Sequence, residues 1–219
     1  MNHSRVNGSV WVEIYADVLC PWSFIGKRRL DTALSGLAAR ARVAVRWRSV
    51  ELDPHLGRVP GRTAAEEMAD PAWWGDQAAS RIAHIQALGA AEGLTLNLHL
   101  ARPVNSFDAH RLLQFAADHG RADAMAEHLL LAYHTDGADI ADPHVLRHLG
   151  VQVGLPATEV AALVAGDAYA AHVRADERRA AEQGATSVPS LVVDGRGPIS
   201  GIQPPHVLHR LLTDATPER

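Results

Sequence analysis

The residue with the clearest potential for chemistry is Cys20, the single cysteine of the 219-residue chain. It lies in the stretch Cys20-Pro21-Trp22-Ser23, where a serine occupies the position that a second cysteine would take in a Cys-x-x-Cys redox pair. A lone thiol cannot form an intramolecular disulfide, so any disulfide made by this chain joins it to another molecule. Ser23 can donate a hydrogen bond toward the sulfur, but it cannot resolve a mixed disulfide.

The position of Cys20 favours a reactive thiol over a small buried hydrophobe. The apolar stretch Ser9 to Val18 predicts a buried strand, and helical spacing of apolar residues begins at Trp22. Cys20 therefore immediately precedes a helix, whose unpaired amide groups and macrodipole stabilise a thiolate, so we expect a lowered thiol pKa. Pro21 suits the first helical turn, because its missing N–H would have no intrahelical partner there.

Two neighbours of the thiol have more than one interpretation. Asp17 could act on Cys20 from the end of the strand, and a carboxylate near a thiolate raises the thiol pKa, against the effect of the helix. A solvated or salt-bridged Asp17 is the alternative. Trp22 offers either a flat apolar surface for a substrate or an anchor for packing.

The elements that must position these residues lie at the two ends of the chain. The pattern predicts a second strand over residues 42–52 and a closing helix over residues 204–212. It also predicts a hairpin whose two strands are residues 189–195 and 196–201. Between the ends, spacing predicts helices at about residues 63–91, 106–119, 123–135, 143–153, 156–165 and 167–183. This order predicts an α/β fold with a four-stranded mixed sheet, strand-helix-strand then strand-strand-helix. Residues 9–58 and 175–214 would form one discontinuous domain, and residues 59–174 an all-helical insertion domain.

Several segments, in the right order along the chain, carry a family pattern. DVLCPWSFIG matches Asp-x-x-Cys-Pro-Trp-Cys-x-x-Gly at Asp17, Cys20, Pro21, Trp22 and Gly26, and departs from it at Ser23. ELDPHL, VNSFDAHRLLQFA, SVPSLVVDG and ISGIQPP are similar to further segments of the same family. The chain thus resembles the DsbA family of the thioredoxin superfamily, in particular its FrnE-like branch, which implies a thioredoxin-like fold.

The resemblance also implies roles for residues far from Cys20. Pro189 would be the cis-proline beside the thiol, and Val188 before it would turn its backbone toward an extended substrate; a proline that begins a strand needs no pairing N–H. Asn105 and His110 would lie on an insertion helix facing the thiol and orient a substrate or a thiol cofactor. His110 is the best acid–base candidate. Helix capping by Asn105 or Ser106 and a buried, hydrogen-bonded His110 are the alternatives.

Ser200 and Gln203 follow the hairpin, near the place where glutathione-binding relatives hold the carboxylate end of their cofactor. Turn and capping roles are the alternative for both residues. We expect no tightly bound cofactor; the thiol chemistry would use a low-molecular-weight thiol such as glutathione or an equivalent. The thirteen histidines show no metal-ligand pattern, so we expect no metal site.

Three functions are compatible with these residues. The first is a thiol oxidoreductase in which Cys20 attacks a disulfide and an external thiol resolves the product, giving reduction or isomerisation. The second is a thiol-dependent cis–trans isomerase of a conjugated small molecule, since kappa-class glutathione transferases and 2-hydroxychromene-2-carboxylate isomerases are related branches. The third, from another class, is a non-catalytic module that binds a peptide or a metabolite.

Composition narrows the partners and the compartment. A formal charge of −4 gives no reason to expect nucleic acid or an anionic membrane as partner, and no run reaches the length of a membrane span. A small molecule or a mixed disulfide is the expected substrate. A single cysteine and the absence of a secretory signal predict a cytoplasmic protein. Trp73 and Trp74 are interpreted as core packing, with a lid over a cleft or a homodimer contact as alternatives.

Overall fold

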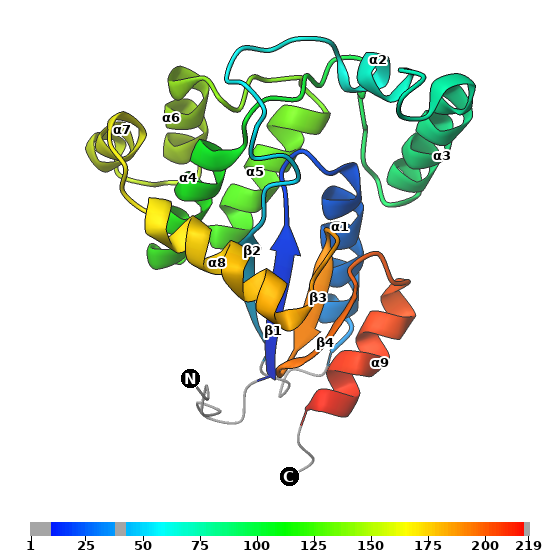
Figure 1. Cartoon of the computed structure of the whole chain (residues 1–219). Coiled ribbons are helices and arrows are strands. Elements are labelled where there is room, and N and C mark those ends of the chain that lie inside the picture. The colour runs from blue at the N-terminus through cyan, green and yellow to red at the C-terminus, as the bar shows by residue number, and fades with distance from the viewer. Residues whose placement is uncertain (1–9, 38–42, 217–219) are drawn as a thin grey trace.

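A four-stranded mixed sheet lies at the centre of the computed structural model, which describes residues 10–37 and 43–216 (Figure 1). Ser9 and Arg42, where two predicted strands begin, lie outside these residues. The strand order is β2-β1-β3-β4, with β2 parallel to β1, and with β3 antiparallel to both β1 and β4. The strands are β1 (Val10–Ala16), β2 (Val43–Ser49), β3 (Ser190–Val193) and β4 (Arg196–Ser200).

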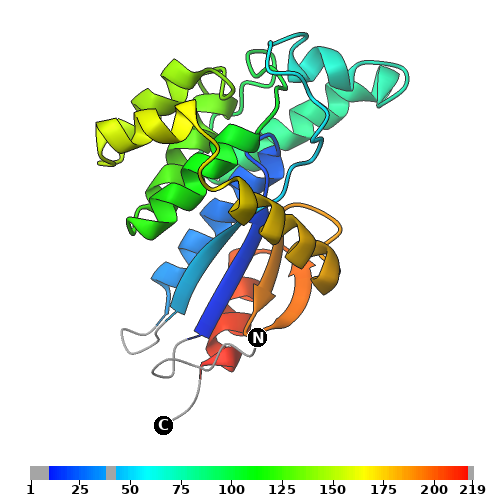
Figure 2. The ribbon, with the colours of Figure 1, turned by 60° about the vertical axis from the view of Figure 1, so that its left-hand side comes forward.

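Helices cover both faces of this sheet, because its strands are apolar on both. On one face Val12 and Ile14 belong to the main core with apolar residues of α1 (Pro21–Ser35) and α9 (Pro205–Ala215). On the other face Tyr15 clusters with Ala180 of α8 (Ala170–Gln183), which crosses in front of the strands in Figure 1 and lies on the opposite side of the sheet from α1 in Figure 2. Side chains alternate across a strand, so consecutive residues of β1 reach different helices.

The remaining helices form a block above the sheet in Figure 1. They are α2 (Ala64–Met68), the 3₁₀ helix η1 (Gly75–Gln77), α3 (Ala78–Ala91), α4 (Phe107–Asp118), α5 (Ala122–His134), α6 (Pro143–Gln152) and α7 (Ala157–Ala165). Together with the strand-helix-strand and strand-strand-helix ends, this block confirms the predicted thioredoxin-like fold with helical content. The predicted domain bounds, residues 9–58 and 175–214 against 59–174, stay a prediction.

The single helix predicted over residues 63–91 is wrong. Thr63 caps the start of α2 through a capping box with Glu66, but the helix ends after Met68. Pro71 has no N–H to donate, the Asp70 carbonyl accepts from Trp73 and Gly75, and Gly75 takes a positive φ of 51°. These residues form turns that separate α2 from α3.

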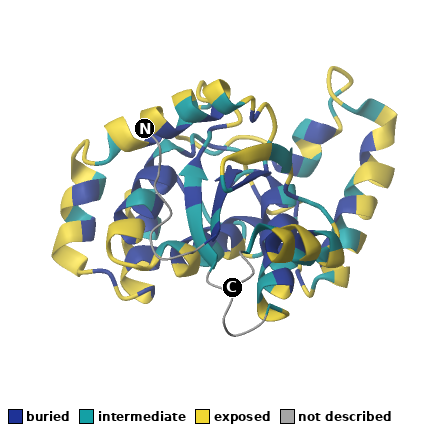
Figure 3. Ribbon diagram, turned by 90° about the horizontal axis from the view of Figure 1, so that it is seen from below, coloured by how far each residue is buried: buried dark blue, intermediate teal, exposed yellow. Residues whose placement is uncertain are grey.

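Core packing was predicted for both Trp73 and Trp74, and this prediction is wrong for Trp73. Trp73 is 55% exposed, whereas Trp74 is half-buried and packs against the main core. Figure 3 shows that buried residues gather in the strands and on the inward sides of the helices. Of the helices in the described ranges, none is long and apolar enough to cross a membrane.

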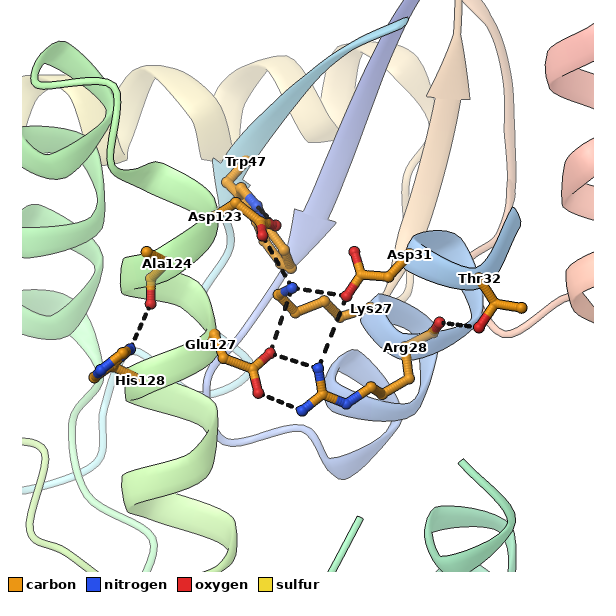
Figure 4. Close-up of polar contacts among 9 residues, drawn as sticks. All are labelled: Lys27, Arg28, Asp31, Thr32, Trp47, Asp123, Ala124, Glu127 and His128. Atoms are coloured by element: carbon orange, nitrogen blue, oxygen red, sulfur yellow. Dashed lines mark hydrogen bonds and ion pairs between the residues drawn. The ribbon is translucent and has the colours of Figure 1, made fainter. Parts of the chain in front are cut away.

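A buried lysine joins α1 to α5 (Figure 4). Lys27 Nζ lies 2.9 Å from Asp31, 3.1 Å from Asp123 and 3.3 Å from Glu127, and the side chain is 4% exposed. Burial alone would lower the pKa of Lys27, but its hydrogen bond to Asp31 and the surrounding carboxylates raise it. Lys27 is therefore held as a cation between a helix of the sheet layer and a helix of the block above it.

Candidate active site

The turn between β1 and α1 positions Cys20. The Cys20 N–H donates to the Asp17 carbonyl at 3.2 Å, and the Ser23 N–H donates to the Cys20 carbonyl at 2.9 Å, which begins α1 at Pro21. The thiol is 5% exposed and donates to the Val188 carbonyl, with Sγ and O 3.5 Å apart. Two segments 168 residues apart in sequence thus meet at the sulfur.

The second segment is the loop that leads into β3. The Val188–Pro189 peptide bond is cis, and the Pro189 carbonyl accepts from the Gly201 N–H at 2.8 Å. A Cβ on Gly26 would lie 2.8 Å from the Gly201 oxygen and 3.1 Å from Pro189 Cγ. Only glycine therefore lets α1 pass this close to the loop, which explains the residue type at position 26.

The predicted lowering of the Cys20 pKa is wrong. Burial raises the pKa of the thiol to about 11, because the thiolate would lose its hydration. The N–H groups of Ser23 and Trp22 at the helix start lower this pKa, as expected of a helix N-terminus, and Asp17 raises it. The effect of desolvation on the thiol pKa is larger than that of the helix N-terminus, so the resting thiol is protonated at neutral pH.

Ser23 is almost completely buried beside the thiol, with 1% of its surface exposed. Its Oγ forms no hydrogen bond of normal geometry with any described residue. The hydroxyl nevertheless lies near enough to the Cys20 sulfur to lower the thiol pKa. The position of Ser23 is compatible with support of a thiolate, and its catalytic role stays a prediction.

Asp17 and His110 form a buried pair next to the turn that carries the thiol. Asp17 Oδ1 lies 3.3 Å from His110 Nε2, and the Asp17 carboxylate also accepts from the N–H groups of Leu19 at 3.2 Å and Leu52 at 2.6 Å. Burial would raise the pKa of Asp17, but the bonds to His110 and to the two backbone N–H groups lower it. Asp17 is thus not solvated, and its contact with His110 matches the salt-bridged form of the alternative interpretation. Its contact with His110 joins α4 to the end of β1, and the prediction that α4 faces the thiol stays a prediction.

Asn105 is engaged in loop contacts. Its Oδ1 accepts from the Phe107 N–H at 3.1 Å at the start of α4, and its Nδ2 donates to Glu51 at 3.2 Å and to the Pro54 carbonyl at 3.3 Å. These bonds match the capping alternative for Asn105 and tie α4 to the segment after β2. Its role in binding stays a prediction.

The other predicted binding residues lie at the edge of this arrangement. Trp22 is half-buried and packs against the main core, which favours the anchor interpretation. Ser200 is exposed at the end of β4, opposite Ser190, and Gln203 is half-buried before α9. Neither the Ser200 nor the Gln203 side chain hydrogen-bonds to another described residue, and their cofactor role stays a prediction.

The structure adds His134, a residue that sequence reasoning missed. It is the last residue of α5, is completely buried, and stacks on Phe24 of α1 at a centroid distance of 6.3 Å. Burial lowers the pKa of His134 to about 4, while the carbonyl groups of Val18 and Cys20 and the charge of Asp17 act to raise it. His134 is one of thirteen histidines and matches no motif, so only the fold identifies it.

Fold and site together define a thioredoxin-fold protein with one buried thiol at a helix start, beside a cis-proline. Residues 11–213 match the family described as DSBA-like thioredoxin domain. The chain belongs to this family.

Solved structures agree with this assignment. A "probable DsbA oxidoreductase" of Streptomyces coelicolor is 37% identical, with a TM-score of 0.88 over 96% of this chain and 91% of that one. The cytosolic disulfide reductase DsbM of Pseudomonas aeruginosa, solved with GSH, is 19% identical, with a TM-score of 0.63 over 93% and 98%. A 2-hydroxychromene-2-carboxylate isomerase is 15% identical, with a TM-score of 0.65 over 93% of each chain. The last two share the fold.

Proposed function

We propose that this DsbA-like protein is a thiol oxidoreductase that acts through Cys20 alone. The Cys20 thiolate attacks one sulfur of a substrate disulfide, forms a mixed disulfide and releases the other sulfur as a thiolate. An external thiol, of the glutathione kind, then attacks the mixed disulfide, frees Cys20 and leaves as a new disulfide. One observation carries the proposal: Cys20 Sγ lies at the start of α1 against the Val188 carbonyl, with a buried serine in the place of the second cysteine of the motif.

The protonated resting thiol requires a proton acceptor, and we assign that role to His110. Its Nε2 faces Asp17, which favours the tautomer with the proton on Nε2 and leaves Nδ1 as an acceptor. Nδ1 is buried and has no hydrogen-bond partner among the described residues. Asp17 stabilises the imidazolium that forms, since its pKa is lowered and it stays ionised. We place the reaction in the cytoplasm, where a single-cysteine enzyme meets reduced thiols.

A second candidate is thiol-dependent cis–trans isomerisation of a conjugated small molecule. The buried Asp17–His110 pair favours it, because reversible addition and elimination at an alkene need an enclosed proton donor and acceptor. In this reaction a thiolate adds to the alkene, the resulting single bond rotates, and elimination restores both thiolate and alkene. No disulfide forms, and Ser23 is then an advantage because no second thiol can trap Cys20.

The test compares wild type with Cys20→Ser. Both proteins are assayed for glutathione-dependent reduction of a mixed disulfide and of insulin, and for isomerisation of a conjugated acid. We expect disulfide reduction by wild type and none by Cys20→Ser. Isomerisation without disulfide reduction would show that the protein is the thiol-dependent isomerase and not the oxidoreductase. Neither activity in a folded wild type would favour the binding module, and reduction that survives Cys20→Ser would remove Cys20 from the mechanism.

A further inference from the structure

The Cys20 thiol is buried against the loop that leads into β3. Its side chain is almost completely buried, and its Sγ lies 3.5 Å from the carbonyl oxygen of Val188. Thiol–disulfide exchange needs direct access of the disulfide to the attacking sulfur, and little of this sulfur is open to a substrate. The proposed function therefore requires an opening that exposes the sulfur, and the loop at Val188 is a segment in direct contact with it.

This loop is held in turn by the segment that follows β4. The Pro189 carbonyl accepts from the Gly201 N–H at 2.8 Å, and a Cβ on Gly201 would lie 2.8 Å from Pro189 Cβ. Gly201 thus packs directly on the residue that follows Val188. Because β4 is an edge strand whose one partner among the described strands is β3, the sheet holds this segment from one side. Whatever fixes the segment after β4 also fixes the loop at the sulfur.

Arg29 of α1 fixes the segment after β4. Its Nη1 donates to the Ile202 carbonyl at 2.6 Å, and no other side chain hydrogen-bonds to residues 201–204 in the part of the chain that the structure describes. Its Nε donates at 2.7 Å to Oε1 of Glu92, at the end of α3. Both members of this ion pair are mostly buried, so salt and water screen it less than an exposed pair. Glu92 thus orients the guanidinium toward Ile202.

Opening of the loop breaks one of the two bonds of Arg29 and leaves the other. The bond to Ile202 joins α1 to the segment after β4, so it is lost when that segment moves away. The bond to Glu92 joins α1 to α3, and neither helix belongs to the loop. Arg29 therefore favours the closed arrangement by one charge-assisted hydrogen bond, and such a difference shifts an equilibrium between closed and open forms.

We propose that Arg29 is a positioning residue that holds the loop at Val188 closed over Cys20, and thereby sets how often the sulfur is exposed. The inference rests on the proposed function of Cys20 as a nucleophile. In the closed form the sulfur is desolvated, which keeps the thiol protonated by raising its pKa. Opening admits water and substrate together, so the thiolate forms when a disulfide can reach it.

The test measures the rate at which Cys20 in the native protein reacts with iodoacetamide at pH 8, a reaction that needs no disulfide substrate. Arg29→Met keeps an apolar chain and removes both hydrogen bonds. Arg29→Lys keeps a cation but lacks the rigid fork that reaches two partners at once. Arg28→Met is the matched control, because Arg28 is the neighbouring arginine of α1 and pairs instead with Glu127 of α5 (Figure 4).

We expect Arg29→Met to react about tenfold faster than wild type, since the closed form loses one charge-assisted hydrogen bond that the open form never had. Arg29→Lys should react at a rate between those of wild type and Arg29→Met, and Arg28→Met should equal wild type. An unchanged rate in Arg29→Met, or the same increase in Arg28→Met, would overturn the proposal.

The urea dependence of the reaction separates opening of the loop from unfolding of the whole protein. Opening of one loop exposes little surface, so the rate should rise only slightly with urea below the unfolding transition. Wild type alone gives this result, which keeps the proposal testable if Arg29→Met does not fold. A slope equal to that of global unfolding would overturn the proposal. A wild-type thiol that reacts as fast as in the unfolded chain would also overturn it.

Parallel assays of disulfide reduction distinguish this inference from the proposed function. Faster alkylation of Arg29→Met, together with no disulfide reduction by wild type, would support the role of Arg29 and count against the oxidoreductase. Disulfide reduction by wild type, together with equal alkylation rates in the two proteins, would support the oxidoreductase and overturn the role of Arg29.

Discussion

Residue 23 carries a hydroxyl oxygen where a second cysteine would carry a sulfur. Because a hydroxyl cannot form a disulfide with Cys20, the chain alone cannot resolve a mixed disulfide at Cys20. Ser23 is buried next to Cys20, and both its N–H and its hydroxyl act on the Cys20 sulfur. Ser23→Cys should therefore form a disulfide between Cys20 and the introduced thiol on mild oxidation, because the two side chains already lie together at the helix start. Free-thiol titration before and after oxidation measures this, with complete loss of reactive thiol expected.

Two variants separate this pairing from the effect of merely adding a thiol. Ser35→Cys places a second cysteine on the exposed end of α1 and should keep both thiols free in the monomer. Cys20→Ser/Ser23→Cys moves the only thiol by three positions and cannot form an intramolecular disulfide. Two free thiols in oxidised Ser23→Cys would show that the side chains do not approach, and would contradict the arrangement of the site.

At the scale of elements, α1 joins the parts of the site. Its first turn carries the thiol, Gly26 in its second turn contacts the loop of Pro189, and Lys27 anchors it to α5, the helix that carries His134. The Lys27 cluster thus fixes α1, whose first turn follows the thiol, against α5.

Lys27→Met should destabilise the fold by about 2 kcal/mol. The substitution leaves Asp31, Asp123 and Glu127 close together without the buried cation. The effect is smaller than for a fully buried pair, because these carboxylates are 38%, 63% and 24% exposed and water screens them. Urea unfolding monitored by circular dichroism gives the free energy of unfolding for each variant.

Arg28→Met is the matched control for this prediction. Arg28 lies next in sequence, pairs with Glu127 and Asp31, and is 32% exposed, so its loss should cost less than about 1 kcal/mol. Added salt should reduce the difference in the free energy of unfolding between wild type and Arg28→Met. The difference between wild type and Lys27→Met should change less. A Lys27→Met variant as stable as Arg28→Met would show that burial of the lysine contributes nothing.

At the scale of the whole molecule, sequence reasoning worked where the signal is local. Alternation and helical spacing predicted the strands and most helices, and the position of Cys20 before a helix was predicted correctly. The prediction of one helix over residues 63–91 was wrong because Pro71 and Gly75 interrupt it. These two residues are a local signal, but the helical spacing of apolar residues on either side of them obscured it.

The thiol pKa could not be predicted in the same way. It depends on burial by segments that are distant in sequence, among them the loop at Val188. The helix N-terminus does act on Cys20 as expected, but enclosure by the whole fold has the larger effect. The burial of His134 likewise has no local signal, since it comes from other elements such as α1, which supplies Phe24.

The same enclosure predicts how the whole molecule responds to acid. The pKa of His134 is about 4 in the folded protein and 6.5 when the group is free, because burial disfavours the imidazolium. Between these values the unfolded chain binds a proton that the native state does not, so stability falls as pH drops from 6.5 to 4 and this contribution falls no further below 4. The loss is roughly 3 kcal/mol, since each unit of pKa difference corresponds to about 1.4 kcal/mol.

Asp17 contributes to the pH dependence of stability in a lower pH range than His134. Its folded pKa is lowered, so its stabilisation is complete above the usual carboxyl pKa and is lost as pH falls toward the folded value. His134→Phe should remove the loss between pH 6.5 and 4 and keep the loss at lower pH. Free energies of unfolding in urea, measured from pH 7 to pH 3 for both proteins, test this. Parallel curves down to pH 4 would mean that His134 is already charged, or exposed, in the native protein.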